Sequence, residues 1–165
     1  MKLVATAALF ASLCGAASAA PAEQLPFGLD ALSWKMSVAD AAAAFPPLRT
    51  PGRADSDAPL TDQESRIVSS YAWKSCTFRI TFYFAASGLA SIFLDRHSAD
   101  PQCAADALAE LVAHYGAAPQ SGDSVLDHRG WATAGTQATF NRMAGSLEIS
   151  VVQVGGKPPT VYDTF

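Results

Sequence analysis

Alternating apolar and polar residues between positions 76 and 84 form the clearest pattern in the chain. A period of two predicts a β-strand with one buried face. The turn-forming residues at 85–88 then lead into a second alternating stretch, which predicts a return strand and so a β-hairpin. The residues expected to face the core are Cys76, Phe78, Ile80, Phe82, Phe84, Ala90, Ile92 and Leu94.

A short helix is predicted before this hairpin. Ser37 and Asp40 have the spacing of an N-terminal capping box, with Asp in place of Glu. An apolar stripe at i, i+3, i+4 and i+7 follows, and Pro46-Pro47 ends it because proline cannot donate the next helical hydrogen bonds. The stripe consists of Val38, Ala41, Ala42 and Phe45. Residues 46–63, which contain four prolines, are predicted to form a loop.

A second helix is predicted from Pro101 to the C-cap residue Gly116. Its apolar stripe consists of Ala104, Leu108, Leu111, Val112 and Tyr115. Further strands are expected at 67–73, 124–134, 136–143 and 146–154, with Phe140, Leu147, Ile149 and Val151 pointing inward.

The element order predicts an α+β fold, a two-layer sandwich in which two tandem α-βββ units form one antiparallel sheet with two helices on one face. The units would span about residues 25–96 and 97–154 of a single domain at 20–154. Residues 155–165 would form a flexible C-terminal tail.

The first residues have the organisation of a secretory signal peptide. Lys2 precedes an apolar stretch at 3–15, and Ala17-Ser18-Ala19 supplies the small residues of a cleavage site after Ala19. The stretch is shorter than the ~20 apolar residues that span a bilayer, so no membrane span is expected. Leu13 before Cys14 does not fit a lipoprotein site, so no lipid anchor is expected. We therefore expect a soluble periplasmic or secreted protein.

Two cysteines remain after cleavage, Cys76 and Cys103. In an oxidising compartment such a pair favours a disulfide. A reactive thiol pair is the alternative, but its wide spacing differs from the C-x-x-C arrangement of redox enzymes.

Composition narrows the function classes. The chain has 165 residues, is 50% hydrophobic and carries a net charge of −4 without a cluster of Lys and Arg, which argues against a nucleic-acid partner. The histidines His97, His114 and His128 lack the spacing of metal ligands, and neither a nucleophile motif nor a nucleotide-binding motif is present. We expect a protein without enzymatic activity, cofactor or metal, although a hydrolase with dispersed catalytic residues remains open.

Two short boxes resemble known secreted domains. Trp34-Lys35-Met36-Ser37, followed by Val38-Ala39-Asp40-Ala41, is similar to the W/F-G-M-S/T-x-x-E-V box of the β-lactamase-inhibitor-protein-like repeats and of the related small lipoproteins of outer-membrane assembly. Tyr115-Gly116-Ala117-Ala118-Pro119 is similar to the helix end of the same families. Lys35 stands where they have glycine. The resemblance implies a protein that binds another protein, often through the open face of its sheet.

The polar side of the predicted sheet is the candidate binding surface. Tyr, Trp and Arg are enriched in interface hot spots because they combine a large contact area with a polar end. The same types also occur on plain sheet surfaces, and the phenylalanine content leaves an apolar-ligand carrier or sensor as a further alternative. The candidate binding residues are Trp73, Arg79, Tyr83, Phe93, Trp131, Gln137, Thr139 and Asn141.

Overall fold

The computed structural model describes residues 24–49, 64–121 and 126–155. The predicted signal peptide, residues 50–63 of the predicted loop and nearly all of the predicted tail lie outside the described residues.

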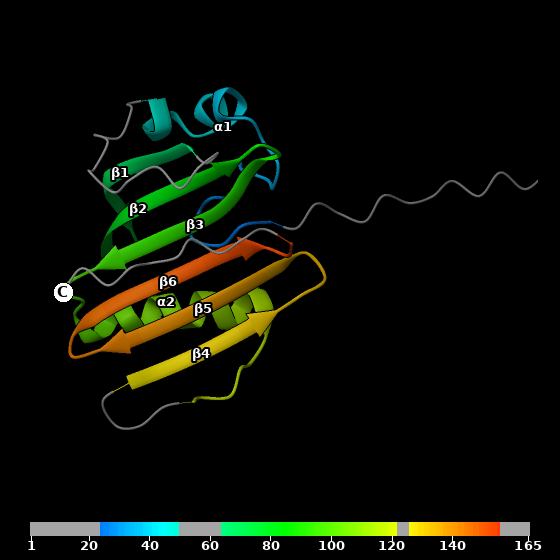
Figure 1. Ribbon diagram of the computed structural model, residues 1–165. Coiled ribbons are helices and arrows are strands. Elements are labelled where there is room, and N and C mark those ends of the chain that lie inside the picture. Colours follow the sequence, from blue (N-terminus) through cyan, green and yellow to red (C-terminus); the bar gives the residue numbers. More distant parts are fainter. Residues whose placement is uncertain (1–23, 50–63, 122–125, 156–165) are drawn as a thin grey trace, which may run out of the picture.

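The fold is α+β, as predicted, with one six-stranded antiparallel sheet and two α-helices (Figure 1). The strand order is β1-β2-β3-β6-β5-β4, so each group of three consecutive strands forms a meander and β3 pairs with β6 where the two meanders meet. The strands are β1 (Glu64–Trp73), β2 (Cys76–Ala85), β3 (Gly88–Arg96), β4 (Leu126–Ala132), β5 (Thr136–Met143) and β6 (Ser146–Gln153).

Helix α1 (Val38–Ala44) begins as its capping residues predict. The Ser37 hydroxyl accepts a hydrogen bond of 3.1 Å from the Asp40 amide, which supplies a partner to one of the free N–H groups of the first turn. Ala41 is buried, and the ring of Phe45 lies 5.7 Å from that of Phe82 on the sheet. The short helix therefore packs on the apolar face of the sheet.

The loop prediction is wrong for its first residues. Pro46–Arg49 form a 3-10 helix, η1, and Leu48 within it is only 2% exposed. Proline is compatible with the first turn of a helix because the N–H it lacks would have no partner there. Burial of Leu48 then holds this turn against the core.

Helix α2 (Pro101–Tyr115) lies across the sheet behind β4, β5 and β6 (Figure 1). The Asp100 carboxylate caps it by accepting from the Cys103 amide at 2.7 Å, and Gly116 ends it with φ 88°. The fully buried stripe is Cys103, Ala104, Ala107 and Leu111, whereas Leu108, Val112 and Tyr115 are half-buried. No helix in the described part of the chain is long and apolar enough to cross a membrane.

The two faces of the sheet differ as the alternation predicts. The face toward the helices is filled by Phe78, Ile80, Phe82, Ile92, Leu94, Phe140, Leu147, Ile149 and Val151, each at most 1% exposed. Arg79 and Tyr83 point to the opposite face, with Arg79 exposed and Tyr83 half-buried.

An irregular segment at 24–36, which the sequence pattern does not predict, completes the core. Leu25, Phe27, Leu29 and Leu32 are each at most 2% exposed. The Trp34 indole nitrogen donates to Thr136 Oγ1 at 2.8 Å, which links this segment to the second meander. The segment makes turns rather than a regular element, so its apolar residues follow no helical or strand period.

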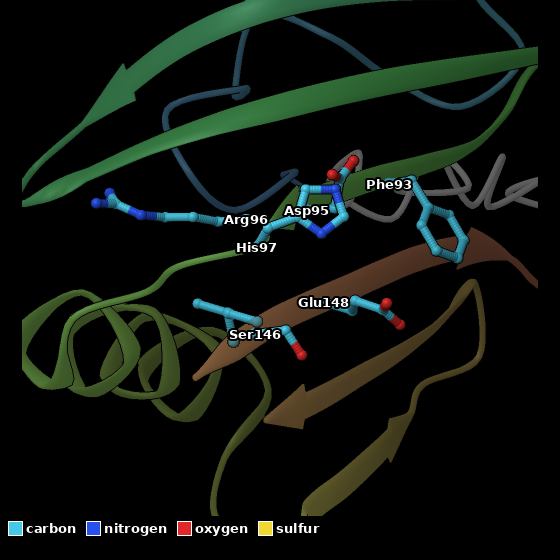
Figure 2. A pocket seen from close by; sticks show the side chains of 7 residues that line it. Phe93, Asp95, Arg96, His97, Ser146 and Glu148 are labelled. Carbon is cyan, nitrogen blue, oxygen red and sulfur yellow. The ribbon is translucent and has the colours of Figure 1, made fainter. Parts of the chain in front are cut away.

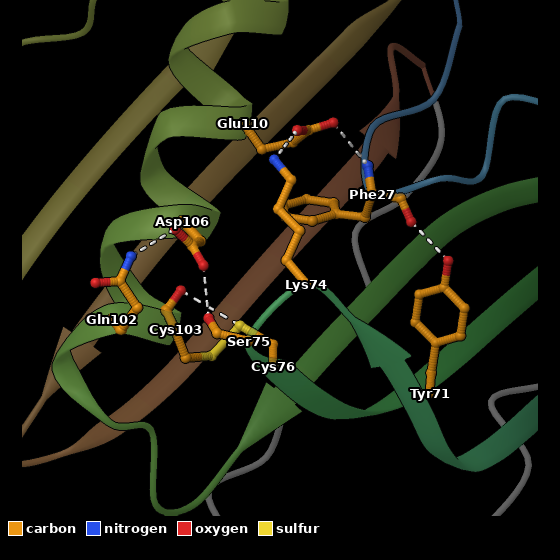
Figure 3. A network of polar contacts seen from close by, with 9 residues as sticks. All are labelled: Phe27, Tyr71, Lys74, Ser75, Cys76, Gln102, Cys103, Asp106 and Glu110. Atoms are coloured by element: carbon orange, nitrogen blue, oxygen red, sulfur yellow. Dashed lines mark hydrogen bonds and ion pairs between the residues drawn. A yellow bond between two sulfur atoms is a disulfide. The ribbon is translucent and has the colours of Figure 1, made fainter.

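The predicted disulfide between Cys76 and Cys103 is present and joins the first residue of β2 to the first turn of α2 (Figure 3). Polar contacts surround it. Lys74 Nζ lies 3.1 Å from Glu110, and the Ser75 hydroxyl donates to Asp106 at 2.6 Å. The bond from Ser75 and a second one from Gln102 lower the pKa of Asp106. The hairpin end of β1 and β2 is thus fastened to α2.

Candidate functional site

The sheet face turned away from the helices is the candidate site, and we call it the open face. Cross-strand register arranges its residues in rows. One row is Arg79, Asp95, Glu148, Asn141 and His128, the next is Thr81, Phe93, Ser150, Thr139 and Gly130, and the third is Tyr83, Ser91, Val152, Gln137 and Ala132.

Two aromatic residues lie near the centre of the open face. The rings of Tyr83 on β2 and Phe93 on β3 are 6.4 Å apart in an edge-to-face arrangement. Both side chains are half-buried. Thr81 stands opposite Phe93 and is only 5% exposed. The pair therefore forms an apolar area on this face.

The β5 side of the open face is polar. Thr139 and Ser150 share a hydrogen bond of 2.6 Å between their hydroxyls. On the row beside them, His128 Nδ1 lies 2.5 Å from Asn141 Oδ1. Thr139 and Asn141 are among the binding residues predicted from the sequence, whereas Ser150 and His128 are not. Their partners across the strands show that both belong to the same surface.

A row of charges crosses three strands. Arg79 Nε lies 3.3 Å from Asp95 Oδ2, and 51% of the Arg79 side chain is exposed. Glu148 stands directly opposite Asp95 on the next strand and is exposed. Neither acid is among the binding residues predicted from the sequence. Asp95 has the parity of Phe93 and Glu148 alternates with Ile149, so strand alternation alone could have placed both on the open face.

A shallow pocket of about 110 Å³ opens beside these acids (Figure 2). Phe93, Asp95, Glu148, Ser146 and His97 are among its lining residues. Arg96 extends away from its centre, donates to the Ser98 carbonyl at 2.8 Å and lies 3.8 Å from Asp100. The pocket thus joins an aromatic wall to two carboxylates.

The structure does not bring Trp73 and Trp131 to the open face. Trp73 lies opposite Cys76, and its ring packs 5.0 Å from that of Phe27, on the helix side. Trp131 lies opposite Ala138, is 7% exposed and donates its indole N–H to the Gly116 carbonyl at 2.7 Å. Both tryptophans therefore stabilise the packing between the sheet and the segments that cover it.

The remaining predicted residues lie together. Arg79, Tyr83 and Phe93 occupy the β2–β3 part of the open face, and Gln137, Thr139 and Asn141 occupy β5. Strands β3 and β6 connect the two groups. The predicted surface is thus continuous once both tryptophans are removed from it.

The histidines are dispersed. His97 follows β3, His128 lies on β4 and His114 lies on α2, where its Nε2 is 2.5 Å from the Gln24 carbonyl. Asp127 points away from its neighbour His128 and pairs with Arg129 at 3.1 Å. No three His, Cys, Asp or Glu side chains come together as metal ligands among the described residues.

The phenylalanines that raised the possibility of an apolar-ligand site pack against one another. The rings of Phe27 and Phe78 lie 6.2 Å apart, and both residues are fully buried. Phe82 and Phe140 are each at most 1% exposed. These side chains build the core between the sheet and its cover.

Comparison with protein-family models, with curated proteins and with solved structures finds no match. The likeness to the β-lactamase-inhibitor-protein-like repeats therefore stays a prediction from the two short boxes.

Proposed function

We propose that the protein is an exported protein-binding module that acts through the open face, either as an inhibitor or as an accessory subunit of an envelope complex. One observation carries the proposal. Among the described residues, the helices and the segment 24–36 lie on one side of the sheet, and Tyr83, Phe93 and Arg79 lie together on the other side.

The composition of the open face supports a protein as the partner. An aromatic centre bordered by polar and charged groups resembles the hot spot and rim of protein interfaces. The supporting strands are fixed by the core beneath them, so a partner would meet a surface with little conformational entropy to lose. The pocket beside Phe93 holds about 110 Å³, which is less than a drug-sized ligand fills.

Export is supported by the disulfide. Bonds between cysteines persist in secreted and periplasmic proteins and are rare in the cytosol. The pair Cys76–Cys103 is consistent with the signal peptide expected at residues 1–19. We infer that the mature protein begins near Ala20.

A tandem origin of the two meanders is the second part of the proposal. Each helix precedes three strands in the chain, and β3 lies beside β6. Lys35 adopts φ 69°, a conformation that glycine favours, in the position where the resembling boxes have glycine. These observations support two α-βββ units of the inhibitor-like type.

The test uses the mature chain as bait in periplasmic extract, followed by titration of the captured protein in purified form. We expect saturable binding that weakens at least tenfold in the double variant Arg79→Ala and Tyr83→Ala. Arg142→Ala is the matched control, since Arg142 is an exposed arginine on the opposite parity of β5. Equal affinity of the double variant and the control would contradict the proposal.

A further inference from the structure

We propose that the open face recognises a basic side chain, an arginine or a lysine of the protein partner, in the pocket between Asp95 and Glu148. This inference rests on the proposed function and specifies the chemistry of the partner. Its basis is the charge and shape of the pocket in Figure 2.

The two carboxylates form an unfavourable pair in the free protein. Asp95 and Glu148 are direct cross-strand neighbours of β3 and β6, a position in which like charges destabilise a sheet. Arg79 lies on the far side of Asp95 and contacts that acid. On its other side Glu148 faces the neutral Asn141. A cation placed between the two acids would relieve the repulsion.

The other basic groups near the pocket do not supply this cation in the described structure. Arg96 is directed to the Ser98 carbonyl and to Asp100. His97 also lines the pocket and is exposed, but it forms no ion pair with either acid among the described residues. The charge of Arg79 balances one acid of the pair, so the row as a whole retains a negative charge at Glu148.

The pocket wall fits the stem of a basic side chain. Arginine and lysine carry an apolar chain that packs on apolar surface while the charged group stays at the opening. Phe93 provides apolar lining next to the carboxylates. A guanidinium can also stack on an aromatic ring and donate to carboxylates at the same time.

A metal ion fits the pocket less well. Calcium takes six to eight oxygen ligands, and only Asp95 and Glu148 supply carboxylates among the lining residues. An ammonium or guanidinium group needs fewer acceptors and brings its own apolar stem. The observations therefore favour a basic side chain over an inorganic cation.

If the repulsion between Asp95 and Glu148 serves binding, its removal should stabilise the free protein. Glu148→Gln removes the like-charge pair, so the free variant should melt about 1 to 3 °C above the wild-type protein. The same change should weaken recognition of the basic group. A carboxylate that served only the fold would show the opposite effect on melting.

The binding test needs no partner protein. Ethylguanidinium, the analogue of an arginine side chain, is titrated into the mature chain while the amide resonances of Phe93, Asp95 and Glu148 are followed by NMR. We expect saturable shifts with ethylguanidinium and none with neutral ethylurea. Glu148→Gln should abolish these shifts. Asp30→Asn, which removes an exposed acid from the segment on the helix side, should retain them.

Two results would overturn the inference. One is the same response to ethylguanidinium in Glu148→Gln as in Asp30→Asn, and the other is a lower melting temperature of Glu148→Gln than of the wild-type protein. A partner that needs Arg79 and Tyr83 but binds Glu148→Gln with unchanged affinity would leave the proposed function standing and remove only this inference. Saturable binding of ethylguanidinium without any captured partner would support this inference and contradict the proposed function.

Discussion

The hydroxyl of Tyr71 donates a hydrogen bond of 2.7 Å to the main-chain carbonyl of Phe27 (Figure 3). This contact joins β1 to a segment 44 residues earlier in the chain. The amide of the same Phe27 donates to Glu110 on α2 at 3.3 Å. Phe27 is therefore held from both sides, although its φ of 64° is uncommon for a residue with a side chain.

Replacement of Tyr71 by Phe should lower the free energy of unfolding by about 1 kcal/mol at pH 7, because the Phe27 carbonyl loses its partner. Burial, and to a lesser extent the charge of Asp30, raise the pKa of Tyr71 above 10.0. The folded state then holds this proton more tightly than the unfolded state, so the stability is present below pH 10 and is lost as the pH rises. Urea unfolding between pH 7 and 11 measures both effects.

The Tyr71→Phe variant should lose less stability above pH 10 than the wild-type protein, because its side chain cannot ionise. Asp30→Asn should make the alkaline loss of stability smaller, since removal of the carboxylate brings the folded pKa of Tyr71 closer to its unfolded value. Parallel alkaline curves for the wild-type protein and Tyr71→Phe would show that Tyr71 ionises freely in the folded state.

Strand alternation predicts more of this molecule than its turns do. Phe78 and Arg79 could be assigned to opposite faces because a strand repeats every two residues. The segment containing Phe27 follows no period, and its burial depends on contacts such as Tyr71 and Glu110, distant in sequence. Leu48 was missed for the same reason, since its burial comes from a single turn of 3-10 helix.

Trp131 shows where knowledge of the register would have changed the predicted site. Strand β4 has no apolar alternation from which its inner face can be read. Its pairing with β5 places Trp131 opposite Ala138, which has the parity of the inward-facing Phe140. That pairing depends on the turn at 133–135, whose geometry the residue types do not specify. The predicted binding role of Trp131 therefore rests on its aromatic character alone.

Trp131→Phe should destabilise the protein by about 1 to 2 kcal/mol, because the hydrogen bond to Gly116 is lost and buried volume decreases. The affinity for the partner should not change under conditions in which the variant is fully folded. Trp73→Phe is the matched control, since the Trp73 indole is half-buried and packs edge-on against Phe27. A loss of affinity in Trp131→Phe without loss of stability would show that Trp131 takes part in binding.

Removal of the disulfide should cost about 3 to 4 kcal/mol by the chain-entropy account, since its cysteines are 27 residues apart. The change is the double variant Cys76→Ala and Cys103→Ala. Both sulfurs are buried, so lost packing adds to the effect. Denaturant unfolding of the oxidised protein, the reduced protein and the variant separates the two contributions. Equal stability of the oxidised and reduced proteins would show that the bond does not support the fold.

Gly88 is the position where a single methyl group should be most harmful. It begins β3 with φ 101°, and an added Cβ would lie 2.2 Å from the Lys35 carbonyl oxygen. The adjacent Leu89 exchanges two main-chain hydrogen bonds with this segment, donating to Met36 at 2.8 Å and accepting from Lys35 at 3.0 Å. Gly88→Ala should therefore cost about 3 kcal/mol or more, because the backbone is strained and this pairing must move.

Gly145→Ala separates the strain of the backbone from the collision at Gly88. Gly145 also has a positive φ, 88°, but nothing lies within 4 Å of its added Cβ. We expect a cost of about 1 kcal/mol there, from the left-handed conformation alone. The difference between the two variants in the free energy of unfolding, measured with urea, gives the cost of the collision between the added Cβ at position 88 and Lys35. Equal costs would mean that the segment at 35–36 yields without loss, and that its contacts with Leu89 add little to the stability of the first meander.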